Sequence, residues 1–190
     1  MTRRSTLWLL TLILLFAALL RIYNLTQQSL WLDEGFTYYV NAQADMFPAI
    51  KANTQPPLYH VLLRLWTLVA GDSIVALRFF STLPSILTVA VVFQLARLLV
   101  KDRSQAAVAA IGALSMFLLA LSDPDIFLAQ ETRSYGWRTL LVSLNAWAYL
   151  LWLRRPTRGR AFWWVISSAA LPYLHYLAAV SYTHLRAHET

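Results

Sequence analysis

The chain has 190 residues, of which 58% are hydrophobic and 13% are charged, whereas a soluble domain has about 25% charged residues. With a mean hydropathy of +0.51 and 8 Trp, this composition excludes most soluble folds and predicts a polytopic membrane protein with aromatic residues at its interfaces. The absence of Cys excludes disulfides and a thiolate nucleophile, while the net charge of +7 raises the question of nucleic-acid binding.

The first expected element is a membrane-spanning helix over Leu7 to Leu20, a run that carries no charge. Arg3 and Arg4 precede this run, and Arg21 follows it at a position where a long side chain can snorkel to the interface. A cleavable signal peptide is the alternative, but it requires a small-residue cleavage site after its apolar core. The residues after Leu20 offer no such site, so we interpret the helix as uncleaved.

Further uncharged stretches are long enough, or nearly so, to cross a hydrocarbon core of about 30 Å at about 1.5 Å per residue. They are Phe79 to Ala96, Ser104 to Ser122, Thr139 to Leu153 and Ala161 to Val180. A shorter apolar stretch, Leu58 to Ala70, follows two prolines and carries Arg64 at its centre. Whether this stretch crosses the membrane decides the topology.

The distribution of charged residues favours a topology in which the short stretch does not cross, because cytoplasmic segments then collect the basic residues and only one acid, Asp102. We therefore predict an all-α membrane protein with about five transmembrane helices, a cytoplasmic N-terminus and an amphipathic helix over Pro57 to Ala70 at the outer interface. Because the basic residues are divided among separate inner segments, we expect membrane lipids and not nucleic acid as partners. These basic residues are Arg3, Arg4, Arg97, Lys101, Arg103, Arg154, Arg155, Arg158 and Arg160.

The last ten residues, Ser181 to Thr190, break the pattern because a hydrophobic helix passes into them without a turn or cap. The string resembles translated sequencing-adapter read-through, so we expect residues 1–180 to be the native part and 181–190 a non-native tail. A zinc site at His184 and His188, with Glu189 beside them, is the alternative interpretation of this tail.

The long outer segment between the first two spans, 24–73, contains two adjacent acids, Asp33 and Glu34. They follow Trp31, an aromatic anchor, and Leu32. A carboxylate near a low-dielectric boundary has its pKa moved toward the range useful for a general base. The alternative is a solvated helix start, where acids interact favourably with the helix dipole. The segment is therefore a candidate catalytic loop.

Three further motifs follow this acidic pair. They are Gln55-Pro56-Pro57-Leu58-Tyr59, then Gly71-Asp72-Ser73 with Ala76-Leu77-Arg78, and then Gln130-Glu131-Thr132-Arg133-Ser134-Tyr135. In this order the motifs resemble the GT-C superfamily of integral-membrane glycosyltransferases, in the branch of the protein mannosyltransferases and lipid A aminoarabinose transferases. The resemblance extends from about Arg21 to Trp152 and implies that the chain is the N-terminal part of a GT-C membrane domain. It implies sugar transfer from a polyprenyl-phosphate donor to a hydroxyl of a lipid, glycan or protein acceptor, on the outer face of what we expect to be the bacterial inner membrane.

The resemblance also implies roles for individual residues. It maps the catalytic base onto Asp33, with Glu34 beside it. Gln55 stands where many members carry His or an acidic residue, so the sequence leaves open whether a divalent metal takes part. Some relatives place a Lys near the Pro-Pro-Leu-Tyr element to hold the lipid phosphate, and the nearest Lys here is Lys51.

The chemistry of the transfer requires donors for the departing phosphate, and Arg offers bidentate donors. Arg133 is the preferred candidate because the topology places it on the same outer face as Asp33, and Glu131 would orient it. A salt bridge between Glu131 and Arg133 that serves only packing is the alternative, while Arg64 and Arg78 either serve the donor lipid or snorkel. The residues assigned to donor and substrate binding are Lys51, Tyr59, Arg78, Glu131, Arg133 and Tyr135.

Two other functions compete with a glycosyltransferase. A transporter places ionisable residues near the bilayer midplane, whereas nearly every acid of this protein is expected in an outer loop. A non-catalytic membrane scaffold explains the hydropathy but not the acidic pair together with the 130–135 motif. We therefore predict a polyprenyl-phosphate-sugar-dependent glycosyltransferase, present here as an inactive fragment because about five spans hold only part of a donor groove.

Overall fold

The structure, a computed structural model, describes residues 3–52 and 56–176. Within these residues it consists of helices and contains no strand. The helices are α1 (Arg3–Ile22), α2 (Leu32–Ala42), α3 (Phe47–Ala52), α4 (Pro57–Ala70), α5 (Ile74–Leu99), α6 (Gln105–Ala120), α7 (Asp123–Ala129), α8 (Tyr135–Arg154) and α9 (Arg158–Leu174).

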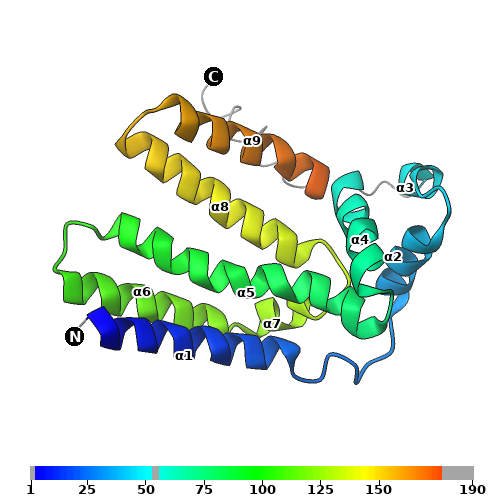
Figure 1. The fold of residues 1–190 in the computed structure, drawn as a ribbon, viewed down its shortest axis with the longest axis horizontal. Coiled ribbons are helices and arrows are strands. Elements are labelled where there is room, and N and C mark those ends of the chain that lie inside the picture. The colour runs from blue at the N-terminus through cyan, green and yellow to red at the C-terminus, as the bar shows by residue number, and fades with distance from the viewer. Residues whose placement is uncertain (1–2, 53–55, 177–190) are drawn as a thin grey trace.

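The five long helices α1, α5, α6, α8 and α9 run side by side along the length of the molecule (Figure 1). Helix α5 lies in the middle and contacts α1, α6 and α8, while α9 packs against α8. The start of α1 and the turns after α5 and α8 lie at one end, whereas α2, α3 and α4 lie at the other (Figure 1). Because α1 ends and α5 begins at this second end, α4 lies at that end and does not run the length of the bundle (Figure 1).

The membrane-spanning candidates are fewer than the sequence predicts. By length and composition α1 and α5 can cross a membrane, and α6 with α7 forms a third candidate that is bent by 60° at the break between them. Helices α8 and α9 cover the other two expected spans but do not pass the same test. The all-α membrane class is therefore confirmed, while the number of crossings stays a prediction. The end of the fifth expected span, 177–180, and the 181–190 tail with its two His residues lie outside the described residues.

The break between α6 and α7 is filled by Arg21, which is fully buried. Its Nε donates to Ser85 Oγ at 2.8 Å, its Nη1 to the carbonyls of Ala17 and Ala120, and its Nη2 to the Leu119 carbonyl and Asp125 Oδ2. A snorkelling side chain reaches the membrane surface, whereas Arg21 is fully buried, so the prediction that Arg21 snorkels is wrong. The last carbonyls of α6 lack helical donors at the break. Arg21 supplies these donors from α1.

A close approach of α8 to α5 fixes the loop that precedes α8. A Cβ atom added at Gly136 would lie 2.2 Å from the backbone oxygen of Ser81. Only a glycine permits this separation, so the first turn of α8 is held directly against α5. The 130–135 motif, which leads into that turn, is placed over the end of α5 as a result.

Candidate active site

The acidic pair lies in the first turn of α2, and its two side chains face opposite environments. The side chain of Asp33 is 44% exposed, whereas Glu34 is 1% exposed. Successive residues of a helix point in directions about 100° apart, and Glu34 belongs to the buried stripe of α2 with Thr37, Val40 and Asn41. The two acids are therefore suited to different tasks.

Glu34 forms a bidentate ion pair with Arg78 of α5. Arg78 Nε lies 3.0 Å from Glu34 Oε1 and Arg78 Nη2 lies 2.7 Å from Glu34 Oε2. The backbone N–H of Thr132 also donates to Glu34 Oε1, at 2.8 Å. Burial raises the pKa of Glu34, but the hydrogen bonds from Arg78 and Thr132 outweigh it, and the net pKa lies below the usual value. Glu34 is therefore ionised at neutral pH.

The remaining N–H groups of Arg78 hold the chain between α1 and α2. Nη1 donates to the carbonyls of Leu25 and Gln28 at 2.7 and 2.9 Å, and Nη2 donates to the Ser29 carbonyl at 3.3 Å. Every N–H group of this guanidinium is thus used within the protein. The geometry gives no support to the phosphate-binding or snorkelling roles expected of Arg78, because no donor is left over and the side chain is buried.

The 130–135 motif is fastened to two other helices. Gln130 Nε2 donates to the carbonyls of Leu20, Arg21 and Tyr23 at the end of α1, at 3.4, 3.2 and 2.9 Å respectively. These carbonyls belong to the last turn of α1 or follow it, so the Gln130 amide caps the carboxyl end of that helix. The motif therefore joins the end of α1 to the start of α8.

Polar side chains of α5 hold the other side of this loop. Ser81 Oγ donates to the Arg133 carbonyl at 2.9 Å, Thr82 Oγ1 lies 3.0 Å from the Ala129 carbonyl, and Ser85 Oγ lies 2.9 Å from Asp125 Oδ2. The roles of Thr82 and Ser85 were not predicted from the sequence. Their spacing from Arg78 could have indicated these roles, because positions four and seven residues later in a helix lie on the same face.

Asp33 and Arg133 are brought together across 100 residues of sequence. Arg133 Nη2 lies 3.5 Å from Asp33 Oδ2, and Arg133 Nη1 donates to the Asp33 carbonyl at 3.4 Å. In the described part of the protein the carboxylate of Glu131 forms no ion pair with Arg133. The alternative interpretation, a salt bridge between Glu131 and Arg133, is therefore not found, and Arg133 pairs with Asp33.

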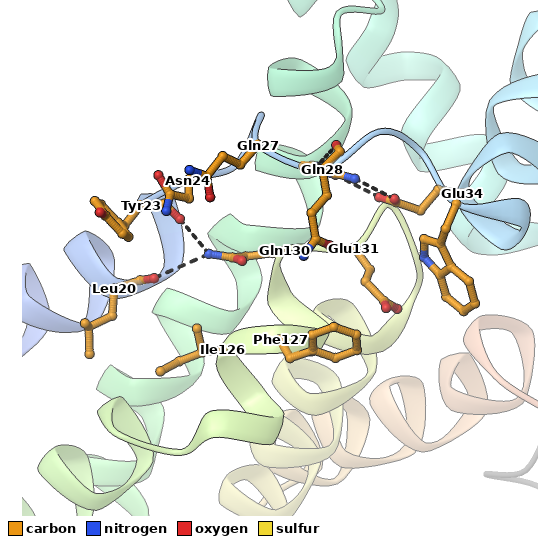
Figure 2. A pocket seen from close by; sticks show the side chains of 12 residues that line it. Leu20, Tyr23, Asn24, Gln27, Gln28, Glu34, Ile126, Phe127, Gln130 and Glu131 are labelled. Atoms are coloured by element: carbon orange, nitrogen blue, oxygen red, sulfur yellow. Dashed lines mark hydrogen bonds and ion pairs between the residues drawn. The ribbon is translucent and has the colours of Figure 1, made fainter.

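Glu131 instead lines a pocket of about 450 Å³ beside Glu34 and Arg78, with Gln130 and Phe127 next to it (Figure 2). Glu131 is 6% exposed, and among the described residues no donor forms a hydrogen bond with its carboxylate. Burial raises the pKa of Glu131, the charge of Glu34 raises it further, and Arg133 offsets part of the change. The other lining residues are Leu20, Tyr23, Asn24, Gln27, Gln28, Trp31 and Ile126.

Tyr59 lies under the site and not within it. The residue is 3% exposed, and its hydroxyl lies 3.0 Å from Ser81 Oγ, the group that donates to the Arg133 carbonyl. Burial raises the pKa of the Tyr59 hydroxyl. The neighbouring His60, which the sequence analysis missed, has its pKa lowered to about 4 by burial and by the charge of Arg133. Helix α4 is thus linked to the backbone of the 130–135 loop through the hydroxyl groups of Tyr59 and Ser81.

Among the described residues, the other predicted residues form no hydrogen bond or ion pair with Asp33 or Arg133. Lys51 is exposed on α3, next to residues 53–55, which include the predicted Gln55 and lie outside the described residues. Tyr135 is half-buried at the start of α8, under the guanidinium of Arg138. Arg64 donates to the carbonyl of Asn41 near the end of α2. No group of His, Asp and Glu suited to a metal ion occurs in the described ranges.

Comparison with known families gives a match over residues 54–176 to the family described as dolichyl-phosphate-mannose-protein mannosyltransferase. The chain belongs to this family. The search of curated proteins and the search of solved structures gave no match. Family membership confirms the predicted resemblance to GT-C enzymes and supports, at the level of the family, an integral-membrane glycosyltransferase over the transporter and scaffold alternatives.

The match covers the Pro-Pro-Leu-Tyr element, Arg78 and the 130–135 motif, and it begins after Asp33 and Glu34. The acidic pair is therefore connected to the matched region by contacts in the structure and not by the match itself. Residues inside the match, Arg78 and Thr132, bind Glu34, and Arg133 pairs with Asp33. Both acids of the pair are consequently bonded to residues of the region that matches the family.

Proposed function

We propose that this mannosyltransferase-family protein transfers a sugar from a polyprenyl-phosphate donor to an acceptor hydroxyl, with Asp33 as general base and Arg133 as phosphate ligand. The observation that carries the proposal is the contact of 3.5 Å between Arg133 Nη2 and Asp33 Oδ2. Both side chains are partly exposed, at 17% for Arg133 and 44% for Asp33, so a substrate can reach them. The proposed site is the end of the bundle formed by α2, α4 and the 130–135 loop.

The proposed reaction uses the two groups in succession. The Asp33 carboxylate takes the proton of the acceptor hydroxyl while the acceptor oxygen bonds to the anomeric carbon of the sugar. The bond between that carbon and the donor phosphate oxygen breaks, and the electron pair leaves with the phosphate. Arg133 stabilises the charge on the departing phosphate through paired N–H groups.

The loose contact between Asp33 and Arg133 suits this exchange. A charge-assisted N–H···O bond is normally about 2.7 to 2.9 Å long, whereas the ion pair here measures 3.5 Å. Among the described residues the Arg133 side chain has one other partner, the Asp33 carbonyl at 3.4 Å. A donor phosphate can therefore replace Asp33 as the ligand of Arg133, and its arrival frees the carboxylate to act as a base.

In the same proposal Glu34 is a positioning residue. Its buried carboxylate touches no substrate, but it adjoins Asp33 in sequence and accepts from the N–H of Thr132, the residue before Arg133. Arg78 fixes that carboxylate to α5 with two further bonds. One buried group thus sets the separation of the proposed base and the proposed phosphate ligand.

The test compares Asp33→Asn, Arg133→Ala and the control Asp72→Asn in the complete protein from which we expect this chain to derive. A positioned base contributes about 100-fold or more to turnover, so Asp33→Asn should lower kcat by at least that factor with little change in donor KM. Arg133→Ala should chiefly raise the donor KM, because it removes binding in the ground and transition states alike. Asp72 is exposed at the same end of the bundle, and Asp72→Asn should have no effect. Normal turnover of folded Asp33→Asn would refute the assignment of the base.

A further inference from the structure

A second polar pocket is lined by residues at the end of α5 and the turn after it, at the end of α8 and the turn after it, and at the start of α9. The turns after α5 and α8 lie at the end of the bundle away from the candidate active site (Figure 1). The pocket has a volume of about 360 Å³. Its lining residues are Leu98, Lys101, Leu151, Arg154, Arg155 and Arg160. No carboxylate lines this basic pocket, and in the part of the protein that the structure describes none of its cations forms an ion pair. The pocket therefore holds a concentration of positive charge without a protein counter-ion.

Arg160 gives the basic pocket a fixed donor group. Its Nη1 donates to the Leu151 carbonyl at 2.7 Å and to the Arg155 carbonyl at 3.4 Å, near the end of α8. These bonds hold the guanidinium in place while its Nε and Nη2 have no hydrogen bond to any described residue. An oriented guanidinium of this kind is suited to the paired oxygens of a phosphate group.

An apolar groove between α8 and α9 adjoins the basic pocket. It has a volume of about 490 Å³. Leu151 and Arg160 line both the groove and the basic pocket, so the two cavities are neighbours along the same helix pair. The other groove residues are Leu141, Leu144, Trp147, Ala148, Trp163, Ile166, Ser167 and Ala170.

We propose that the groove and the basic pocket together bind one anionic phospholipid, with its phosphodiester in the basic pocket and an acyl chain in the groove. Charge complementarity selects this occupant, because a neutral lipid leaves the cations unpaired and free phosphate leaves the groove unfilled. Basic pockets between membrane helices are recognised binding places for anionic headgroups. The positive-inside effect accounts for the number of basic residues in these turns, but not for their arrangement around a pocket that continues into an apolar groove. The proposal concerns the opposite end of the bundle and does not depend on the proposed sugar transfer.

The first test measures binding to the purified 190-residue protein in a neutral detergent, with thermal unfolding as the readout. The probes are phosphatidylglycerol, phosphatidylcholine with the same acyl groups, and inorganic phosphate. Phosphatidylglycerol should raise the unfolding temperature in a saturable way, and the other two probes should raise it much less. An equal response to phosphatidylcholine, or a response to inorganic phosphate as large as that to phosphatidylglycerol, would overturn the proposal.

The second test separates the basic pocket from general charge. A basic residue near an anionic lipid contributes about 1 kcal/mol, so the loss of two should weaken binding by about 30-fold. Arg154→Gln with Arg155→Gln should show this loss of affinity for phosphatidylglycerol. The matched control is Arg103→Gln with Arg158→Gln. Like Arg154 and Arg155, these two residues are exposed at this end of the bundle, but they do not line the pocket. The affinity of the control should change less than threefold. Equal losses in the two double variants would show general charge attraction and no pocket.

The third test concerns the groove. Ala170 lines the groove, whereas the adjacent Ala169 is exposed and does not. Ala170→Phe should weaken phosphatidylglycerol binding at least tenfold because the new ring occupies the place of the acyl group, and Ala169→Phe should leave binding unchanged. Ala148→Phe, on the facing helix, repeats the test if Ala170→Phe unfolds. Unchanged binding by a folded groove variant would overturn the placement of the acyl group.

Discussion

The buried acids Glu34 and Glu131 should respond in opposite ways to the same substitution, Glu→Gln. Glu34 accepts three hydrogen bonds from Arg78 and the Thr132 N–H, whereas among the described residues no donor bonds to the Glu131 carboxylate. The two residues are similarly buried, at 1% and 6% exposure. The surroundings of each carboxylate, and not the depth of burial, therefore decide the result.

The magnitude for Glu34 follows from its ion pair with Arg78. Glu34→Gln leaves the Arg78 guanidinium buried without a counter-ion, and breaking one partner of a buried pair costs about 3 to 5 kcal/mol. For a protein of this size each kcal/mol lowers the unfolding temperature by about 2 to 4 °C. We therefore expect a decrease of about 6 to 20 °C at pH 7. Glu131→Gln should raise the unfolding temperature at pH 7, because it removes a charge that burial and Glu34 both disfavour.

The pH dependence of the unfolding temperature tests the expected sign of the effect at Glu34 and at Glu131. The folded pKa of Glu34 lies below its ordinary value of 4.5, so its contribution to stability is present above pH 4.5 and is lost as the pH falls through the folded pKa. The folded pKa of Glu131 lies above 4.5, so the folded state binds the extra proton and stability falls as the pH rises from 4.5 through the folded pKa. The gain from Glu131→Gln should therefore disappear below about pH 4.5.

The assay is thermal unfolding of the purified protein in detergent, followed by Trp fluorescence at pH 4 and pH 7 with a fixed heating rate. Asp72→Asn, an exposed acid, controls for the loss of one negative charge and should change little. A decrease at pH 7 for Glu131→Gln similar to that for Glu34→Gln would refute the reasoning, because it would mean that the Glu131 charge is stabilised in the folded state.

Three further predictions follow from the fold and the topology. Gly136→Ala should destabilise the protein by about 1 to 3 kcal/mol in the same unfolding assay, because the new Cβ meets the Ser81 carbonyl oxygen, whereas Gly159→Ala, with open space around it, should be neutral or slightly stabilising. In single-Cys labelling of intact cells, Ser29→Cys and Ser122→Cys should react from outside and Gly159→Cys should not, and the reverse result for the last two would show that Pro57 to Ala70 crosses the membrane. The purified 190-residue protein should not transfer sugar from a polyprenyl-phosphate donor, and detection of transfer would contradict our interpretation of it as an incomplete enzyme.

Local sequence signals predicted α4 to the residue. Two prolines begin the helix at Pro57, and Gly71 follows its last residue with a φ of +79°, a conformation that glycine adopts readily. The charge pattern also predicted that this helix does not cross the membrane, and that part stays a prediction. The two ends of α4 depend on neighbours along the backbone, so the sequence contains them directly.

The roles of the charged residues depend on distant partners and were harder to predict. Arg21 and Arg78 have the sequence context of interfacial residues, yet both are buried and bonded to segments that lie far away in the sequence. Asp33 and Glu34 look equivalent as an adjacent pair, but the rotation of α2 places one outward and the other inward. The pairing of Asp33 with Arg133 agrees with the predicted common face, and the catalytic roles of both residues stay predictions.

The position of Arg21 constrains the order of events during biosynthesis. Its partners Leu119, Ala120 and Asp125 are separated from it by 98, 99 and 104 residues. At a synthesis rate of about 5 to 20 residues per second, about 5 to 20 seconds pass between translation of Arg21 and of these partners. During that interval the guanidinium has only the Ala17 carbonyl and, once α5 has been made, Ser85 Oγ as partners within the protein. The contacts that bury Arg21 can therefore form only after the α6–α7 break has been synthesised. A nascent polypeptide arrested earlier should retain a solvent-accessible Arg21.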